Sequence, residues 1–297
     1  MREPALIRML SDGRRLHLHD GPIDLIIEAS GSPQAISAAY EAAARRFVSI
    51  LDELCGELPA LRSRSRRNSE PPRGVVAQRM FASVRPYCED CFITPMAAVA
   101  GAVAEEILES MTAAVTLRRA YVNNGGDIAI YLADSQSYRI GMVERPDRPS
   151  LFGSLEISAA DPVRGIATSG WRGRSFSLGI ADAVTVLADC ASAADAAATV
   201  IANAVNLPNH PAITRVPARE ISLDSDLGNL LVTRGVESLS DSEIAAALDA
   251  GVRVAESLRA HGLIHSSALC LQSHTRVISA PLAPAPIDLS QRSFLHA

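Results

Sequence analysis

The residues with the clearest chemical potential form a short polar turn between two apolar runs. Asn123 and Asn124 are followed by Gly125, Gly126 and Asp127, with Arg-Ala-Tyr-Val before the turn and Ile-Ala-Ile-Tyr after it. Glycine adopts positive φ angles at little cost and lets a backbone approach a ligand closely. Asn and Asp side chains cap turns or bind polar ligands. The pattern therefore fits two structures, a tight β-hairpin turn and a ligand-binding turn.

A second candidate is a pair of oxygen-bearing side chains further along the chain. Asp195 and Thr199 are separated by four positions in an alanine-rich stretch, so a helix would place them on one face. Carboxylate and hydroxyl oxygens suit a hard cation such as Mg²⁺, which usually completes its shell with substrate phosphate and water. The alternative is structural, because Asp favours the start of a helix and Thr199 could simply be packed.

The basic residues of the chain limit its chemistry. All 28 are arginine, because the sequence contains no lysine. This excludes a lysine Schiff base with a pyridoxal cofactor, a Walker A lysine and a lysine general base. An anionic ligand would therefore be held by arginine, by backbone N–H groups or by a metal ion. The formal net charge of −5 gives no electrostatic reason to expect a nucleic-acid partner.

The amino-acid composition limits the class of protein to which the chain can belong and indicates where in the cell it is expected. With 297 residues, 48% apolar and only 4% aromatic, the chain reads as a globular protein with Ala-rich helices. No run of 18 apolar residues occurs, and the N-terminus lacks an apolar signal core, so we expect no membrane partner and a cytoplasmic location. The five cysteines are scattered and odd in number, which suits reduced thiols.

The elements that must position these residues alternate between strands and helices, which predicts an α+β fold. Ser240 and Glu243 fit a capping box at the start of the last helix. Helical spacing predicts helices over 33–55, 74–85, 94–114, 192–204 and 241–261. Alternation and turn residues predict a hairpin over 15–28, strands over 119–123, 127–132, 138–143, 151–158, 164–168, 183–188, 219–223 and 229–234, and a final hairpin over 264–279.

We expect one α+β domain over residues 1–280 and an extended or disordered Pro-rich tail over 281–297. Residues 61–73 are polar and basic, and they end in two prolines and an arginine. This composition predicts a mobile, solvated loop. The alternative is a lid or a phosphate-attracting arm next to a binding site.

Three motifs together resemble the ApbE family, and a divergent branch of it in particular. They are the strand–Asn-x-Gly-Gly-Asp-Ile–strand element at 122–130, the triplet Thr168-Ser169-Gly170 and the segment from Ala194 to Thr199. Their order and spacing match the family over roughly residues 90–205. ApbE proteins are Mg²⁺-dependent transferases that cleave FAD and attach FMN through a phosphoester to a Thr or Ser of a target flavoprotein. The resemblance implies an ApbE-like, T-fold-like architecture, with mixed or antiparallel sheets packed against Ala-rich helices.

The resemblance also implies a role for each matching residue. Asp195 and Thr199 would be metal ligands, Ser169 and Gly170 would border the cleft, and the helix around Gly101 would lie near the metal and phosphates. The turn would line the flavin nucleotide pocket with Asn123, Asn124, Gly125, Gly126 and Asp127. The implied cofactors are Mg²⁺ and FAD, and the implied partners are a flavin nucleotide and an acceptor flavoprotein.

Transfer would need a carboxylate that accepts the proton of the acceptor hydroxyl. Asp127 and Asp182 are the candidates, and Asp182 could instead serve a turn or cap. Two positions depart from the family pattern: Ala100 stands where the family helix normally carries a lysine before its glycine, and Phe176 stands where the family often has a histidine. Arg172 or Arg174 could supply the missing cation, but arginine is a poor base.

Other functions fit the same residues. One is a non-catalytic module that holds a flavin or another nucleotide-like ligand, and the two departures favour it. Another is an enzyme of a different class that acts on a small molecule in the same cleft. Cys88 and Cys91 form a lone CxxC, a weak zinc or redox signal. The Ala-rich helices and the hairpin with His17 and His19 are candidate surfaces for a homodimer.

Overall fold

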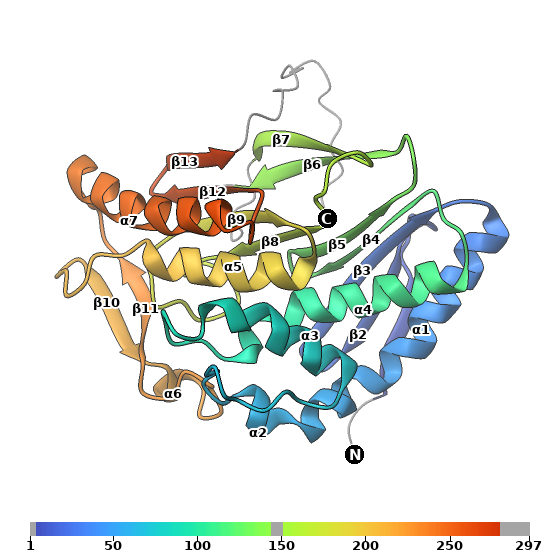
Figure 1. Cartoon of the computed structure of the whole chain (residues 1–297), viewed down its shortest axis with the longest axis horizontal. Helices are drawn as coiled ribbons and strands as arrows, with labels where there is room; N and C mark the ends of the chain where they lie inside the picture. Colours follow the sequence, from blue (N-terminus) through green and yellow to red (C-terminus); the bar gives the residue numbers. More distant parts are fainter. Residues whose placement is uncertain (1–3, 144–150, 280–297) are drawn as a thin grey trace.

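A nine-stranded antiparallel sheet forms the centre of the protein in a computed structural model that describes residues 4–143 and 151–279 (Figure 1). Each strand pairs with its neighbour in the antiparallel sense. In spatial order the strands are β1 (Leu6–Met9), β2 (Leu16–Asp20), β3 (Ile23–Ser30), β4 (Arg119–Asn124), β5 (Asp127–Leu132), β8 (Gly165–Ser169), β9 (Ala183–Ala188), β12 (Ser266–Leu271) and β13 (His274–Ser279).

The strands form where the sequence alternates. On β3, Ile23, Leu25 and Ile27 are buried, whereas Asp24 and Ile26 between them are partly exposed. Successive side chains of a strand point to opposite faces of the sheet, so this pattern buries one face more deeply than the other. The buried face is the one that the helices cover.

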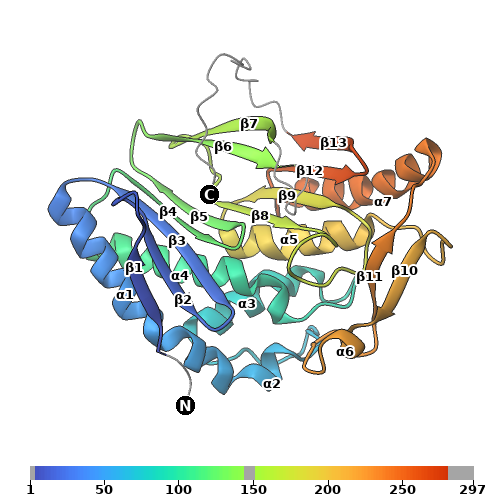
Figure 2. The same ribbon diagram turned by 180° about the vertical axis from the view of Figure 1, so that it is seen from behind.

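Four long helices cover that face, in front of the sheet in Figure 1 and behind it in Figure 2. They are α1 (Pro33–Gly56), α4 (Val99–Ala114), α5 (Ala191–Ala204) and α7 (Asp241–Ala260). Ser32 caps α1 by accepting the Ala35 N–H, and Ser240 and Glu243 form the predicted capping box of α7. Shorter elements connect them: α2 (Leu58–Leu61), α3 (Val75–Val84), α6 (Ala218–Ile221) and the 3₁₀ helices η1 (Arg85–Tyr87) and η2 (Pro95–Ala98).

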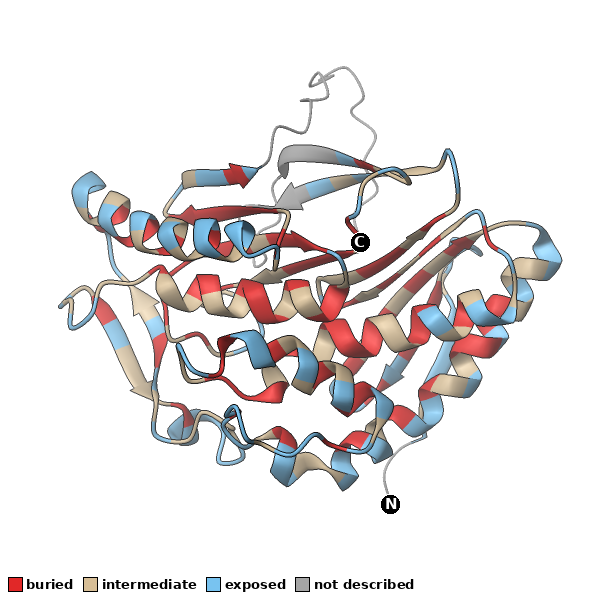
Figure 3. Cartoon of the chain, viewed as in Figure 1, coloured by how far each residue is buried: buried red, intermediate tan, exposed pale blue. Residues whose placement is uncertain are grey.

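The two faces of the sheet carry separate apolar cores. The larger core lies between the sheet and the helices, and Figure 3 shows its buried residues on the strands and on the helix sides that face them. The smaller core lies on the opposite face, next to the ribbon of β6 (Ser137–Val143) and β7 (Leu151–Ser158). It contains Ile130, Leu132, Ile157, Val163, Ile166 and Leu187.

Two details of the sequence prediction are wrong. The strand expected over 219–223 lies earlier, as β10 (Ile213–Pro217), which pairs with β11 (Leu231–Val236). Pro217 ends β10 and is the N-cap residue of the helical turn α6, which begins at Ala218. The short edge strand β1 was not predicted, since four residues give too little alternation to detect.

The expected fold class is confirmed: antiparallel sheets pack against helices, and α5 is alanine-rich. Residues 61–73 lack regular structure apart from the last residue of α2, as predicted for a loop. None of the helices in the described ranges combines the length and apolar character needed to cross a bilayer. The tail expected over 281–297 lies outside the described residues.

Candidate functional site

The polar turn joins β4 to β5 at one end of the sheet. Gly125 and Gly126 both have positive φ angles, of 66° and 113°. Asn123 Oδ1 accepts the Gly126 N–H at 2.8 Å, and the buried Asn124 donates from Nδ2 to the Ala100 carbonyl at 3.1 Å. The turn is therefore a hairpin turn that is also tied to the first turn of α4.

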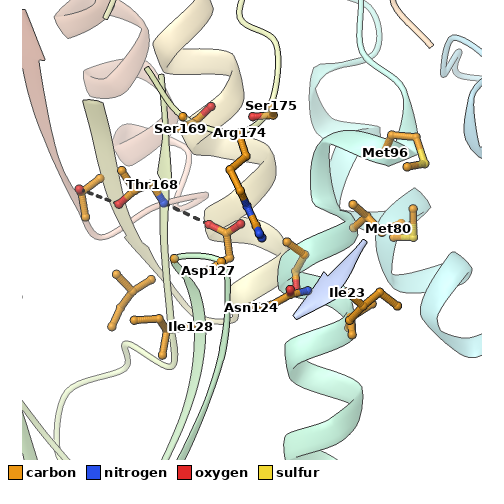
Figure 4. Close-up of a pocket in the computed structure, with 18 of the residues that line it drawn as sticks. Ile23, Met80, Met96, Asn124, Asp127, Ile128, Thr168, Ser169, Arg174 and Ser175 are labelled. Carbon is orange, nitrogen blue, oxygen red and sulfur yellow. Dashed lines mark hydrogen bonds between the residues drawn. The ribbon is translucent and has the colours of Figure 1, made fainter. Parts of the chain in front are cut away.

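The same turn borders a cavity of about 1420 Å³. On the helix side of the sheet its wall is apolar and comes from β3, α1, α3, η2 and α4 (Figure 4). That wall contains Ile23, Leu51, Leu54, Met80, Met96 and Val103. A space of this size and character can enclose a ligand with a large ring system.

The cavity also has a wall on the opposite face of the sheet. Ala167, Val184 and Val186 belong to the helix-side core, so their neighbours on β8 and β9 point the other way. Those neighbours line the cavity, namely Ile166, Thr168, Thr185 and Leu187. The cavity therefore extends around the end of the sheet, and the Gly125–Asp127 turn lies where its two parts meet.

Three guanidinium groups line this cavity, from Arg62, Arg172 and Arg174, together with the carboxylate of Asp127. Arg174 lies directly against the turn, because a Cβ atom on Gly125 would be only 2.2 Å from its Nη2. Figure 4 shows the Arg174 and Asp127 side chains pointing into the same region. Arg172 is already paired with the carboxylate of Asp182. The guanidinium groups of this lining suit a ligand with phosphate groups, which arginine binds in a bidentate manner.

Asp127 and Asp195 come together although they are far apart in the sequence. Asp127 Oδ1 accepts the Thr168 N–H at 3.2 Å, and Asp195 Oδ2 accepts the Gly101 N–H at 3.0 Å. Burial raises the pKa of Asp127 to about 7, against the opposing effects of the Thr168 N–H and Arg174. Burial, and then the charge of Asp127, raise the pKa of Asp195 well above its ordinary value. The charge of Asp127 thus opposes the ionisation of Asp195, and a cation bound beside both carboxylates would relieve this repulsion.

Mg²⁺ fits this arrangement. Asp127 and Asp195 supply carboxylate oxygens, and Thr199 lies one turn after Asp195 on α5. Among the described residues there is no cluster of three or more His, Cys, Asp or Glu that could hold a metal. Mg²⁺ usually binds through one or two carboxylates and takes its other ligands from substrate phosphate and water. The residues predicted as metal ligands, Asp195 and Thr199, thus lie one turn apart on α5, and Asp127 lies near Asp195.

The raised pKa of Asp127 predicts how stability depends on pH. Its folded pKa of about 7 exceeds its ordinary value of 3.8, so the folded state retains a proton that the unfolded state has lost. The free energy of unfolding therefore falls as pH rises from the ordinary pKa of 3.8 to the folded pKa of about 7. The new side chain in the variant Asp127→Asn cannot ionise, so the variant lacks this loss of stability. Its unfolding free energy relative to that of the wild type should therefore rise by on the order of 1 kcal/mol between pH 5 and pH 8. The partial exposure of Asp127 keeps this difference small.

Urea unfolding at both pH values with EDTA present measures this difference. The exposed Asp134 gives a matched control, because Asp134→Asn removes the same charge from a solvated loop. A constant difference between Asp127→Asn and the wild type across this range would contradict the assignment.

Asp182 occupies a different position from the one expected of a base. It is only 4% exposed, and it is not among the residues that line the cavity. Its carboxylate accepts hydrogen bonds from Trp171 Nε1 at 3.1 Å, Arg172 Nε at 2.5 Å and the Gln272 N–H at 2.6 Å. These bonds hold the segment that carries Arg172 and Arg174 against the β12–β13 turn. The structure thus gives Asp182 contacts that suit a positioning residue.

The two other predicted glycines act through close packing. A Cβ atom on Gly170 would lie 2.5 Å from the Asp182 carbonyl oxygen, and one on Gly101 would lie 2.3 Å from that of Ala191. Gly101 thus lets α4 and α5 approach each other, and its N–H reaches Asp195. Ser169 does line the cavity, next to Thr168.

Gly101→Val should separate α4 from α5 and destabilise the protein by about 1–3 kcal/mol, the usual cost of overpacking a core. It should also lower metal affinity, because Asp195 would lose its fixed position. Gly56→Val is the matched control, since nothing lies within 4 Å of a Cβ atom at that helical glycine. Chemical denaturation measures both variants, and equal stability would show that the helices can separate at no cost.

Some site residues were missed by sequence reasoning. The apolar wall was not predicted, because helix positions that face a cavity carry the same residue types as positions that face a core. Arg62 lies at the start of the predicted basic loop, and that composition was its only signal. The CxxC thiols gain no functional support: burial raises the pKa of both Cys88 and Cys91, and both are free thiols.

Comparison with known proteins gives three findings. Residues 7–277 match the model of a family described as AbpE bacteria. UPF0280 proteins of Methanopyrus kandleri and Methanosarcina barkeri are both 40% identical, over 43% and 39% of this chain and 48% and 44% of their own. The chain thus spans about half the length of the curated relatives it matches. The crystal structure of apo Pseudomonas stutzeri flavinyl transferase ApbE aligns with 93% of this chain and 95% of its own, at 11% identity and a TM-score of 0.48.

Proposed function

The chain belongs to the family described as AbpE bacteria, and on that premise we propose that its cavity binds a flavin nucleotide with Mg²⁺ and transfers FMN to a flavoprotein. The membership agrees with the family resemblance that the three sequence motifs indicated. The observation that carries the proposal is the convergence on one cavity of an apolar wall, three arginines and Asp127. The carboxylate of Asp195 does not line the cavity, but it lies close enough to feel the charge of Asp127. Each part suits one component of the ligand: the ring, the phosphates and the cation.

In the proposed reaction an acceptor hydroxyl attacks the FMN phosphorus of FAD, the bond to the bridging oxygen breaks, and AMP leaves. Arg172 and Arg174 would hold the phosphates. Asp127 would accept the hydroxyl proton, because it is the carboxylate that lines the cavity. Bound Mg²⁺ would neutralise charge on the phosphate oxygens. No lysine is available for these tasks, so arginine and the carboxylates carry them.

Two experiments test the proposal in order. Isothermal titration with FAD, with Mg²⁺ and then with EDTA, should show binding that the metal strengthens, and riboflavin should bind at least about 10-fold more weakly because it lacks phosphate. The protein, FAD and Mg²⁺ are then mixed with candidate acceptor flavoproteins, and covalent flavin fluorescence and AMP release are measured. Absence of FAD binding would remove the proposal entirely.

Arg174→Ala should weaken FAD binding by about 10-fold, the value of one charge-assisted hydrogen bond, and leave riboflavin binding unchanged. Arg253→Ala is the control, because Arg253 is exposed on α7. An equal loss of affinity for both ligands would show that Arg174 shapes the cavity and does not bind phosphate.

The second candidate is a binding module without transfer. Ala100 and Phe176, which replace the family's lysine and histidine, favour it. Tight Mg²⁺-dependent FAD binding, combined with no AMP release across several acceptors, would select the module over the transferase.

A further inference from the structure

A second, smaller cavity lies outside the site described above. Its volume is about 350 Å³, and it is formed by the basic loop that follows α2 together with the segment after η1. Its lining residues are Arg64, Arg66, Arg67, Asn68, Cys88 and Glu89. The three motifs of the family resemblance and the proposed function use none of these residues. The sequence analysis noted them only as parts of the basic loop 61–73 and of the CxxC motif.

The loop that carries these arginines is anchored at several points. The Ser65 N–H donates to the Ile93 carbonyl at 2.8 Å, which ties the loop to the chain just before η2. The Arg66 N–H donates to Ser69 Oγ at 3.0 Å, and the Arg67 N–H donates to Glu89 Oε1 at 3.1 Å. The backbone under the guanidinium groups is therefore fixed in place, so the cavity needs little reorganisation to bind a ligand.

The charges of this cavity are not balanced. In the part of the chain that the structure describes, no carboxylate pairs with the side chain of Arg64, Arg66 or Arg67, and Arg64 lies 5.9 Å from the ring centroid of Phe92. Glu89 is the one acidic residue in the lining, and it already accepts the Arg67 N–H and the Cys88 thiol. Three guanidinium groups against one carboxylate give the lining a formal charge of +2.

The geometry points to a binding site for a phosphate-class dianion in this second cavity, held by Arg64, Arg66, Arg67 and the amide of Asn68. A charge of +2 matches a dianion, and guanidinium forks match the several oxygens of a tetrahedral phosphate. A single carboxylate offers half the charge and fewer oxygens, so it would bind more weakly. Burial keeps the Cys88 thiol neutral by raising its pKa, so it adds no negative charge.

This inference is independent of the proposed function, although the same loop serves both cavities. Arg62 lines the large cavity, and Arg64, two positions later, lines the small one. A phosphate group bound here would sit beside the first site without entering it. The arginines of the large cavity would also bind phosphate, so the test must separate the two sites.

The test starts from the full chain with Arg62→Ala and Arg174→Ala, which weakens phosphate binding in the large cavity. Inorganic phosphate should still bind to this background in isothermal titration, and acetate should bind at least about 10-fold more weakly. Adding Arg66→Ala and Arg67→Ala should weaken phosphate binding at least 10-fold. Adding Arg253→Ala and Arg259→Ala instead, which removes the same charge from the exposed side of α7, should change it less than twofold.

Absence of phosphate binding to the background, equal binding of acetate, or equal losses in both additional variants would overturn the inference. A second measurement does not depend on those variants. In the unmodified chain labelled with ¹⁵N-arginine, phosphate should shift the Nε–Hε signals of Arg64, Arg66 and Arg67. Signals that stay in place at saturating phosphate would overturn the inference as well.

Discussion

Replacing Asp195 with asparagine is expected to abolish the Mg²⁺ dependence of FAD binding and to weaken binding in the presence of Mg²⁺ at least about 100-fold, because the variant lacks the carboxylate that we propose as a metal ligand. The change should leave the fold intact. Asparagine keeps an oxygen that can accept the Gly101 N–H, which Asp195 accepts at 3.0 Å. It also removes a carboxylate whose pKa is raised by burial and then by the charge of Asp127.

Titration calorimetry with FAD at several Mg²⁺ concentrations measures this effect. Asp249→Asn, on the exposed side of α7, is the matched control and should behave as the wild type. Urea unfolding with EDTA present should show that Asp195→Asn is at least as stable as the wild type. A variant that still responds to Mg²⁺ as the wild type does would place the metal away from Asp195.

Local patterns predicted most of the fold. The alternation on β3, the Ser32 cap and the Ser240–Glu243 capping box each depend on residues within a few positions, so the sequence displays them directly. The error over 219–223 arose in a short segment, where a helical turn of four residues begins after Pro217 and alternation does not reveal it. The order of the strands in the sheet depends on contacts between distant segments and was not predicted.

The motifs of the candidate site could be predicted from the sequence, but the way in which the fold brings them together could not. The resemblance paired the Asn123–Asp127 turn with Asp195, and the structure joins them because Gly101 and the alanines of α5 let two helices approach closely. The contacts of Asp182 could not be foreseen, since one of its donors is the backbone N–H of Gln272, on the β12–β13 turn. A carboxylate before a strand looks the same whether it binds a substrate or holds two loops together.

Removing the Asp182 carboxylate should therefore act first on stability. Asp182→Ala would leave the Trp171 indole, the Arg172 guanidinium and the Gln272 N–H without their acceptor. Breaking a buried ion pair by removing one partner costs about 3–5 kcal/mol, and the partial exposure of Arg172 places the cost near the lower end. Urea unfolding measures it, and Asp224→Ala, at an exposed loop position, is the control.

The isosteric variant Asp182→Asn separates a positioning residue from a base. If Asp182 only positions the segment with Arg172 and Arg174, asparagine keeps some of the hydrogen bonds. The variant should then lose part of the stability and part of the FAD affinity together, with Asp127 still able to accept a proton. If Asp182 were the base, asparagine would leave stability and FAD affinity near the wild-type values and would abolish AMP release alone. Because three donors already occupy the Asp182 carboxylate and Asp127 faces the cavity, we expect the first pattern.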